Sequence, residues 1–228
     1  SLTNGKYYKL TNDIYLNDTT KENWQETAKE WFEGTALFGG TLDGAGYAIY
    51  GLYAESTSKN NNCCGLFQYT SGNAVIKNLH LRDVNIKAAR AGAFVGKAEG
   101  ILTIENCSVK GEITGVSEGS GDMRAGGFIG YAINRVTIKN SYIDATLGRT
   151  GTYGYIGGLI GEFYRGSGDT TSTINIENSY ANTGKPIIDK CSSADGAEVM
   201  TYITINNVYS KTAQTEATYE ATRSITGV

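Results

Sequence analysis

Proline, histidine and methionine are nearly absent from this sequence. Its 228 residues include one Pro, one His and two Met. Because His80 is the single histidine, a metal site with several histidines is excluded, and a catalytic triad has at most one histidine base. Nothing near His80 in the sequence reads as a nucleophile, so we interpret it as a filler on the outer surface.

Long apolar stretches are missing as well. No segment is long enough to span a bilayer, and there is no signal peptide. A start at Ser1 without Met is what an excerpt that begins after a signal would have, so we expect a piece of a longer chain. The net charge of −3 and the pI near 5.3 argue against nucleic acid or an anionic membrane as a partner.

Glycine and tyrosine are abundant, with 30 and 16 copies, and they recur within a repeat. Each unit has a block of small and apolar residues, such as GGFIG at 126–130, followed by a segment such as VTIKNSY at 136–142. Units are 27 to 38 residues apart, a period typical of folds in which each unit buries its apolar face against its neighbour. One position is asparagine in five units, with Gly51 as a weaker first copy: Asn78, Asn106, Asn140, Asn178 and Asn207.

The residues around this asparagine alternate between apolar and polar. An isoleucine lies two positions before it in every unit, and most units have another apolar residue four positions before it. This period of two predicts a strand with one buried face. The apolar phase slips by one residue after the asparagine, so we expect a bend there, in the left-handed backbone that Asn tolerates, with an inward Asn column. The isoleucines expected to stack in the core are Ile76, Ile104, Ile138, Ile176 and Ile205.

The residue just before the asparagine indicates how the units stack. It is Lys77, Glu105, Lys139 and Glu177 in successive units, so opposite charges would pair if the units lie in register. We therefore predict an all-β fold: a single-stranded right-handed parallel β-helix, or β-solenoid, of about six rungs. In that register the four charged residues should lie about 5 Å apart from rung to rung.

These motifs resemble a known family. GGFIG, GGLIG and GAFVG, with the segments TIKNSY, NIENSY and TIENCS, are similar to the GLUG-motif repeats of bacterial secreted and cell-surface proteins, over roughly residues 5 to 210. Gly51 and Gln68 depart from the pattern. The resemblance implies an exported, extracellular or cell-surface β-helix, often within a longer multidomain protein. It transfers no catalytic residues, and some members carry the repeats beside a separate protease domain.

The two ends of the chain differ from the repeats. We expect an N-terminal cap at 1–37, the β-solenoid at 38–210, and a C-terminal cap or linker at 211–228. The first of these segments opens with alternating apolar residues that predict a first strand, and the last one lacks the isoleucine column. A solenoid needs its ends covered, which is the role we expect for the cap.

Residues 19–32 of the cap have the pattern of a short helix. Thr19 and Glu22 match a capping box, and the apolar residues that follow fall on one helical face. We interpret this helix as a lid that buries Trp24 and Trp31 over the first rung. A binding patch made of the same aromatic residues is the alternative.

The acidic residues do not form an active site by their positions in the sequence. A glycosidase needs two carboxylates that face one groove. Glu105 and Glu177 belong to the charged column, Asp43 lies in a tight LDGAG turn, and Asp83 and Asp144 are isolated. We interpret all five as solvated or paired surface charges, and we assign no catalytic residue.

The cysteines do not predict a zinc site, because no Cys-x-x-Cys spacing occurs. Cys107 occupies a buried column and is interpreted as an inert core thiol. An exported protein permits disulfides, so Cys191, in a predicted loop, has the adjacent Cys63 and Cys64 as possible partners.

No cofactor is expected, with calcium as an open alternative. The sequence GSGD occurs twice, ending in Asp122 and Asp169, in loops rich in small residues. Such loops can hold calcium through carboxylate and backbone oxygens. The two loops lack a second acid at regular spacing, so we interpret them as plain turns.

The strongest candidate for binding is a column of tyrosines two positions after the asparagine. Tyr142, Tyr180 and Tyr209 should stack on three successive rungs, facing outward. A row of amphipathic rings suits a sugar chain or a protein partner, and the alternative is an aromatic ladder that rigidifies the sheet.

The sequence therefore predicts a non-enzymatic, adhesin-like surface module that binds glycan or a host or bacterial surface protein. Two alternatives stay open: a polysaccharide-degrading β-helix enzyme, and a structural stalk that presents another domain. Carboxylates brought together across two rungs would favour the enzyme.

Overall fold

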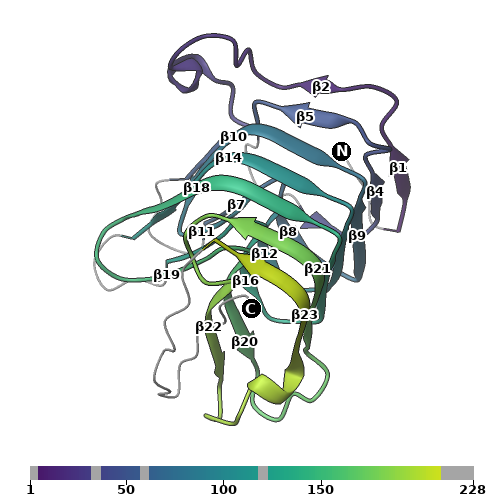
Figure 1. Ribbon diagram of the computed structural model, residues 1–228, viewed down its shortest axis with the longest axis vertical. Helices are drawn as coiled ribbons and strands as arrows, with labels where there is room; N and C mark the ends of the chain where they lie inside the picture. The colour runs from purple at the N-terminus through teal and green to yellow at the C-terminus, as the bar shows by residue number, and fades with distance from the viewer. Residues whose placement is uncertain (1–4, 32–36, 57–61, 118–122, 212–228) are drawn as a thin grey trace.

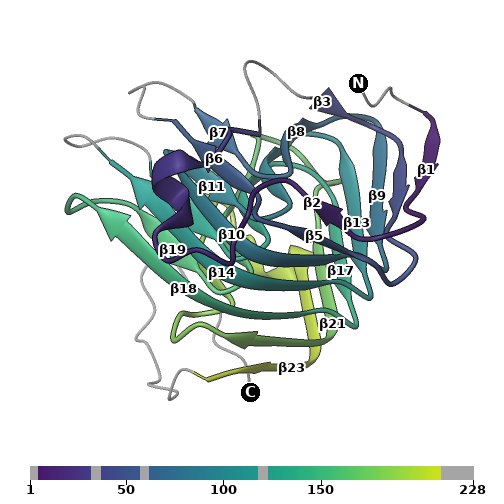
Figure 2. The same cartoon turned by 90° about the horizontal axis from the view of Figure 1, so that it is seen from above.

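The computed structural model describes residues 5–31, 37–56, 62–117 and 123–211. These residues form three parallel sheets that wind into a β-solenoid of about six turns, which confirms the predicted fold class. In Figure 1 the strands stack from the N-terminal end at the top to the C-terminal end below, and Figure 2 shows the sheets as sides around a common core.

The largest sheet bends along the asparagine column into two arms, and most turns of the coil contribute one segment to each arm. The first arm contains β1 (Tyr7–Lys9), β4 (Thr41–Asp43), β9 (Asn73–Lys77), β13 (Ile101–Glu105) and β17 (Val136–Lys139). The second arm contains β2 (Ile14–Tyr15), β5 (Ala48–Tyr50), β6 (Tyr53–Glu55), β10 (His80–Ala88), β14 (Ser108–Val116) and β18 (Tyr142–Thr150). Two strands run through both arms, β21 (Ile174–Asn182) and β23 (Ile203–Ser210).

The other two sheets close the coil, and the small-residue blocks of the repeat form the connection between them. One sheet consists of β7 (Cys63–Cys64), β11 (Arg90–Gly92), β15 (Arg124–Gly126) and β19 (Tyr155–Gly157). The other consists of β3 (Leu37–Phe38), β8 (Phe67–Thr70), β12 (Val95–Ala98), β16 (Ile129–Ala132), β20 (Ile160–Arg165) and β22 (Ile188–Ser193).

The isoleucine column stacks as predicted. The strand register places the five isoleucines opposite one another, with Leu42 on top of Ile76. The first four are fully buried, and Ile205, on the last strand, is half-buried against the core. Each fully buried side chain contributes about 1.5–3 kcal/mol, so this column is a major source of the stability of the coil.

The asparagine column makes the expected bend, with φ between 48° and 54° at all five positions. The prediction that these side chains point inward is wrong, because four of them are exposed and Asn78 is half-buried. The bend needs no side-chain partner, since the N–H of Asn106, for example, donates to the carbonyl of Lys139 on the next turn at 3.1 Å. The amides instead bond one another: Nδ2 of Asn106 donates to Oδ1 of Asn78 at 3.1 Å, and the pattern repeats up to Asn207.

In the first copy of the repeat, the residue at the asparagine position differs from the predicted one. Asp43 pairs with Lys77, so Gly44 rather than Gly51 takes the place of the asparagine. Gly51 instead donates its N–H to the carbonyl of Arg82 on the next turn at 3.0 Å and has a φ of 68°. Leucine replaces isoleucine two positions before Gly44, which hid the correct alignment. Only the first repeat is affected, and the five asparagines lie at the bends as predicted.

The charged column is in register, as predicted. Lys77 pairs with Glu105, Glu105 with Lys139, and Lys139 with Glu177 along adjacent strands. Nζ of Lys139 lies 3.3 Å from Oε2 of Glu177. Asp43 extends the alternation at the N-terminal end, with its Oδ2 at 3.6 Å from Nζ of Lys77.

The N-terminal cap is built differently from the predicted helix. A 3₁₀ helix of four residues, η1 (Trp24–Thr27), replaces the α-helix expected over 19–32. The predicted capping residue Thr19 donates its hydroxyl to Asp83 at 2.9 Å, and Asn23 adopts a left-handed backbone with a φ of 56°. Both tryptophans are half-buried, and Nε1 of Trp31 donates to the carbonyl of Leu66 at 2.9 Å.

A cap was predicted at the N-terminal end of the coil, and a cap or a linker at the C-terminal end. At the N-terminal end β1 and β2 add short strands to β4 and β5. At the other end a second 3₁₀ helix, η2 (Met200–Tyr202), precedes β23. Of the predicted C-terminal segment at 211–228, all but Lys211 lies outside the described residues. No helix in the described ranges is long and apolar enough to cross a membrane.

Candidate functional site

The outward surface of the second arm, which we call the tyrosine face, carries the predicted tyrosine column. His80, Ser108, Tyr142, Tyr180 and Tyr209 occupy equivalent positions on successive strands. We call Tyr142, Tyr180 and Tyr209 the tyrosine row. Their side chains are 47%, 40% and 53% exposed. Rows of large exposed rings are uncommon on soluble proteins and mark candidate contact surfaces.

Local sequence explains why the tyrosines point outward. Ser141 and Ser179, one residue earlier, are buried, and Ile143 and Ala181, one residue later, face the core. Because side chains alternate along a strand, the tyrosine between them must face solvent. The bend at the asparagine sets this phase, so the tyrosine row follows from the repeat.

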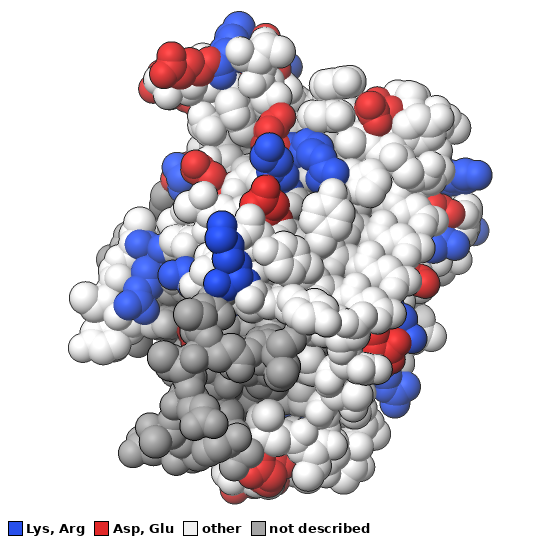
Figure 3. All heavy atoms as spheres, viewed as in Figure 1, with Lys and Arg blue, Asp and Glu red and all other residues white. Residues whose placement is uncertain are grey.

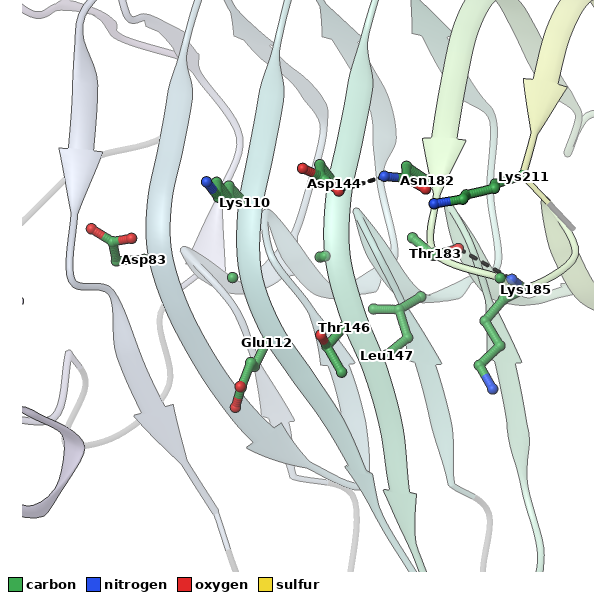
Figure 4. A pocket seen from close by; sticks show the side chains of 13 residues that line it. Asp83, Lys110, Glu112, Asp144, Thr146, Leu147, Asn182, Thr183, Lys185 and Lys211 are labelled. Atoms are coloured by element: carbon green, nitrogen blue, oxygen red, sulfur yellow. Dashed lines mark hydrogen bonds between the residues drawn. The ribbon is translucent and has the colours of Figure 1, made fainter. Parts of the chain in front are cut away.

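A groove of about 680 Å³ lies beside the tyrosine row on the same surface (Figure 4). It crosses β14, β18 and the end of β21. Asp144 stands two residues after Tyr142, and its Oδ1 accepts a hydrogen bond from Nδ2 of Asn182 at 2.7 Å. The polar and charged residues around the groove are Asp83, Lys110, Glu112, Asp144, Thr146, Asn182, Thr183, Lys185 and Lys211.

One wall of the groove is formed by a β-bulge. The register between β10 and β14 shifts between Leu81 and Val84, and Asp83 inside this shift has a left-handed φ of 52°. The Oδ2 atom of Asp83 accepts the hydroxyl of Thr19, which ties the cap to the bulge. Bulges bend a strand locally, and they are over-represented beside functional sites.

The sequence interpretation of the acidic residues was partly wrong. Asp83 and Asp144, taken as isolated, line the same groove together with Glu112, which was not considered. They lie on three successive turns of the coil, 29 and 32 residues apart in the sequence, and the stacking of the turns brings them together. Glu105 and Glu177 lie in the charged column of the first arm, as expected.

An aromatic pair on the tyrosine face was missed by sequence analysis. The rings of Tyr15 and Tyr50 stack with centroids 4.8 Å apart and planes at 8°. Tyr50 pairs in register with Arg82, so the pair continues the outward surface toward the N-terminal end. The dipeptide Ile-Tyr at 14–15 and at 49–50 was the available signal, because the isoleucines pair and the tyrosines follow them outward.

Figure 3 views the molecule from the direction of Figure 1, which includes the tyrosine face. Charged side chains of both signs gather over β10, β14 and β18, and they lie beside a largely uncharged area toward β21. The face therefore joins an aromatic region to a charged one.

His80 shares the column of the tyrosine row but not its exposure. Its Nδ1 lies 2.7 Å from Oγ of Ser108, and the ring is half-buried. Burial lowers the pKa of His80, and the neighbouring Arg82 lowers it further. A neutral imidazole bonded to a serine fits a packing role in this position, in line with the sequence interpretation.

A buried charged cluster lies on the opposite side of the coil and was not foreseen. Glu162 is 1% exposed and forms an ion pair with Arg124; its other oxygen accepts the Ser192 hydroxyl at 2.9 Å and lies 3.3 Å from Nζ of Lys190. The Arg124 guanidinium stacks on Tyr131 at 4.3 Å, and burial raises the pKa of Tyr131 to about 12. These groups join two sheets and satisfy one another, so we treat the cluster as structural.

The four cysteines are free and buried. Cys107 is 1% exposed, which confirms that it is a core residue, and burial raises the pKa of its thiol to about 12. The possible disulfide from Cys191 is not formed, because this residue lies in β22 with its side chain in the core rather than in a loop.

The calcium alternative gains no support. Hydrogen bonds from the side chain of Ser172 and from the backbone N–H of Thr171 hold the pKa of the Asp169 carboxyl well below its usual range, and the backbone N–H of Ser172 also donates to its Oδ1. This is the plain turn that the sequence predicted. Asp122 lies outside the described residues, and the described ranges contain no group of three or more acidic, His or Cys side chains that could hold a metal ion.

Comparison with known proteins gives a sequence match and a fold match. A segment of halomucin from Haloquadratum walsbyi is 32% identical over 161 residues, which is 70% of this chain and 2% of halomucin. This chain thus spans a very small part of that relative. A crystal structure of a candidate immunoglobulin A1 protease from Bacteroides ovatus superposes with a TM-score of 0.56 over 97% of this chain and 77% of that chain. At 15% identity this likeness shows a shared fold. No protein-family model matches the chain.

Proposed function

We propose that this chain is a non-enzymatic binding module of a secreted or cell-surface protein, adhesin-like, and that it binds glycan along the tyrosine face. The observation that carries the proposal is the tyrosine row, in register and exposed, beside an open groove. Strands lie about 4.8 Å apart, so the row is about 10 Å long, and the face from β2 to β23 is about 29 Å long. This length suits an extended oligosaccharide.

The chemistry of the face also supports a sugar ligand. Tyrosine rings offer flat apolar surfaces for the C–H faces of a pyranose, and their hydroxyls add polar contacts. The groove supplies amide, hydroxyl and charged groups such as Asn182, Thr146 and Lys110 within the same surface. Sugar-binding sites need this combination, since a sugar has an apolar face and a polar rim.

The exported location is part of the proposal. The similarity to a segment of halomucin fits a surface or secreted module. The resemblance to GLUG-motif repeats, which rests on the motifs of the sequence, adds to it. We expect the module to belong to a longer chain. The match covers 2% of halomucin, which fits this expectation.

A glycan array probed with the purified domain tests the proposal. We expect the wild type to bind a defined set of glycans, and a variant with Tyr142, Tyr180 and Tyr209 replaced by Ala to lose about tenfold or more in affinity, because each ring would be a central contact. Tyr153→Ala is the matched control, since this tyrosine is 62% exposed and lies in the loop between β18 and β19, outside the row.

Two results would contradict the proposal. If the wild type binds no glycan, a protein partner or a role as a structural stalk would replace it. If the control variant loses as much affinity as the triple variant, the tyrosine row is not the contact surface. Circular dichroism of each variant establishes that the fold is intact.

One observation favours a second function, a polysaccharide-degrading enzyme. Glu112 and Asp144 lie on neighbouring strands, offset by two residues, with both side chains lining the groove. Diagonal positions of this kind have Cα atoms about 7–8 Å apart, within reach of the carboxyl separations of glycosidases. The test is to incubate the domain with a glycan that it binds and to measure reducing ends. An increase that Glu112→Gln abolishes would establish the enzyme. If the glycan stays intact, the binding module remains the proposed function.

A further inference from the structure

A second row of side chains runs along the tyrosine face beside the tyrosine row, two residues further along each strand. It consists of Lys110 on β14, Asp144 on β18, Asn182 on β21 and Lys211 after β23, and we call it the charged row. Arg82 lies beyond the end of this row, inside the register shift between β10 and β14. Lys110 pairs in register with Asp144, and Asp144 with Asn182. Lys211 donates its backbone N–H to Ala181 at 3.1 Å and lines the groove next to Asn182 (Figure 4).

The carboxylates of this surface already have donors within the protein. Asp144 accepts from Asn182 at 2.7 Å, Glu112 accepts from Nδ2 of Asn85 at 3.4 Å, and Asp83 accepts from Thr19 at 2.9 Å. These contacts hold the acids at the walls and floor of the groove. They leave less of the acidic surface available to a ligand.

The cations of the same surface are not engaged in this way. Within the described part of the chain, Lys110, Lys185 and Lys211 form no ion pair, although seven other cationic side chains do. The groove has as many lysines as carboxylates, three of each, in a chain with a net charge of −3. Its surface is therefore less acidic than the chain as a whole.

We infer that the ligand of the tyrosine face is an acidic oligosaccharide, one that carries carboxylate or sulfate groups. Its ring faces pack on Tyr142 and Tyr180, and its acidic groups pair with Lys110 and Lys211. These two lysines are three strands apart, about 14 Å, which selects a chain with acidic groups on separate sugar units over a single sugar. An ammonium group on a flexible stem suits anions of different geometry, so carboxylated and sulfated sugars share this chemistry.

This inference rests on the proposed function and narrows it. An acidic peptide would satisfy the lysines as well, but it would not use a row of exposed tyrosines spaced by the strand repeat. Sugar units offer a ring face and an acidic group within one residue, which matches the tyrosine row and the charged row lying side by side. We therefore assign the face to a glycan and treat the peptide as an outcome of the test.

The test is titration calorimetry of the wild-type domain with three probes: an oligogalacturonate, a neutral oligosaccharide of the same length, and polyglutamate. A fourth titration with a sulfated oligosaccharide distinguishes the two sources of negative charge. We expect the acidic glycans to bind at least about tenfold more tightly than the neutral one, because one charged contact of ordinary strength contributes that much. We also expect their affinity to fall as salt increases from 50 to 500 mM, because screening weakens exposed charge pairs.

A charge-reversal variant tests whether these two lysines cause the preference for acidic glycans. Lys110→Glu combined with Lys211→Glu should lower the affinity for the acidic glycan at least about tenfold and lower the affinity for the neutral one much less. Lys9→Glu is the matched control, because this exposed lysine lies on β1 in the first arm, away from the groove. All three positions are exposed, so the variants should fold, and thermal unfolding checks this.

Each contrary result has a distinct meaning. Equal binding of neutral and acidic glycans, or an unchanged affinity in the charge-reversal variant, would overturn this inference and leave the glycan-binding function standing. Polyglutamate bound as tightly as the oligogalacturonate would also overturn it, in favour of an acidic protein partner. No binding to any of the glycan probes, together with an empty array, would overturn the proposed function itself.

Discussion

A single asparagine at each bend does two things in this fold. It holds the left-handed backbone that turns the strand from the first arm into the second, and its amide joins a chain of hydrogen bonds that runs along the coil. The first asparagine donates to Oδ1 of Asp43 at 3.0 Å, so the chain ends on a carboxylate at the N-terminal side. Tyr7 and the backbone of Ala45 also donate to this carboxylate, which holds the pKa of Asp43 well below its usual range.

These two contributions can be separated at Asn140. Asn140→Gly keeps a residue that is at ease with a φ of 48° and loses the amide hydrogen bonds, while Asn140→Ala loses both. We expect the Ala variant to be about 1–2 kcal/mol less stable than the Gly variant, the cost of a left-handed backbone for a residue with a Cβ. Urea unfolding measures the difference; equal stability of the two variants would show that the bend carries no such strain.

At the residue scale, the side-chain directions could be predicted where apolar and polar residues alternate regularly along the sequence. The buried isoleucines and outward tyrosines follow from alternation, and the left-handed backbone follows from the slip in phase at Asn140. The direction of the asparagine side chain did not follow, because it depends on which backbone groups the next turn already satisfies. That information belongs to the register of two strands, and a single segment does not contain it.

At the scale of elements, the glycines of the repeat allow two sheets to approach closely. A Cβ placed on Gly130 in β16 would lie 2.8 Å from the backbone nitrogen of Ala91 in β11 and 2.8 Å from the carbonyl oxygen of Gly96. Both neighbours are backbone atoms, which cannot move aside as the end of a side chain can. The small-residue block is therefore a packing requirement of the corner between these sheets.

Substitution by alanine should be costly at one glycine and nearly neutral at another. Gly130→Ala should destabilise the protein by about 1–3 kcal/mol, because the added methyl group overpacks the contact. Gly148→Ala in β18 should change stability by less than about 0.5 kcal/mol, because the nearest atom to its Cβ would be 3.9 Å away. Thermal unfolding of both variants checks the pair, and a tolerated Gly130→Ala would be inconsistent with the close approach described.

The helix expected at 19–32 shows why a local pattern can mislead. Its capping box and apolar face were present in the sequence, but Thr19 bonds Asp83 and Trp31 bonds Leu66, both of which belong to the repeats. Long-range hydrogen bonds to the first turns of the coil thus override the local preference for an α-helix. The groove was hidden for a related reason, since Asp83, Glu112 and Asp144 come from three different turns.

At the scale of the whole molecule, the cluster around Glu162 joins sheets that the repeat alone would leave in apolar contact. Its carboxylate links Arg124 on β15 with Lys190 and Ser192 on β22. Breaking a buried pair is costly because the partner charge is left uncompensated in the interior. This cluster is therefore a point at which one side chain controls the packing of two sheets.

Removing the charge of Glu162 tests this role. Glu162→Gln should lower the free energy of unfolding by about 3–5 kcal/mol, as expected for an interrupted buried ion pair. Glu177→Gln is the control, because its pair with Lys139 has a distance of 3.3 Å but is partly open to solvent, and it should cost less than about 1 kcal/mol. Urea unfolding of both variants gives the comparison, and similar losses would show that burial does not strengthen the Glu162 cluster.

The tyrosine row has a consequence for how proteins of this kind can change. Its members occupy the same position in successive repeats, so duplicating one repeat would add one tyrosine and lengthen the face by about 4.8 Å. The number of repeats therefore sets the length of the sugar chain that the face can accommodate. Because the loops between strands vary in length without disturbing this spacing, gain or loss of repeats could change ligand size in discrete steps while the contacts with each sugar unit stay the same.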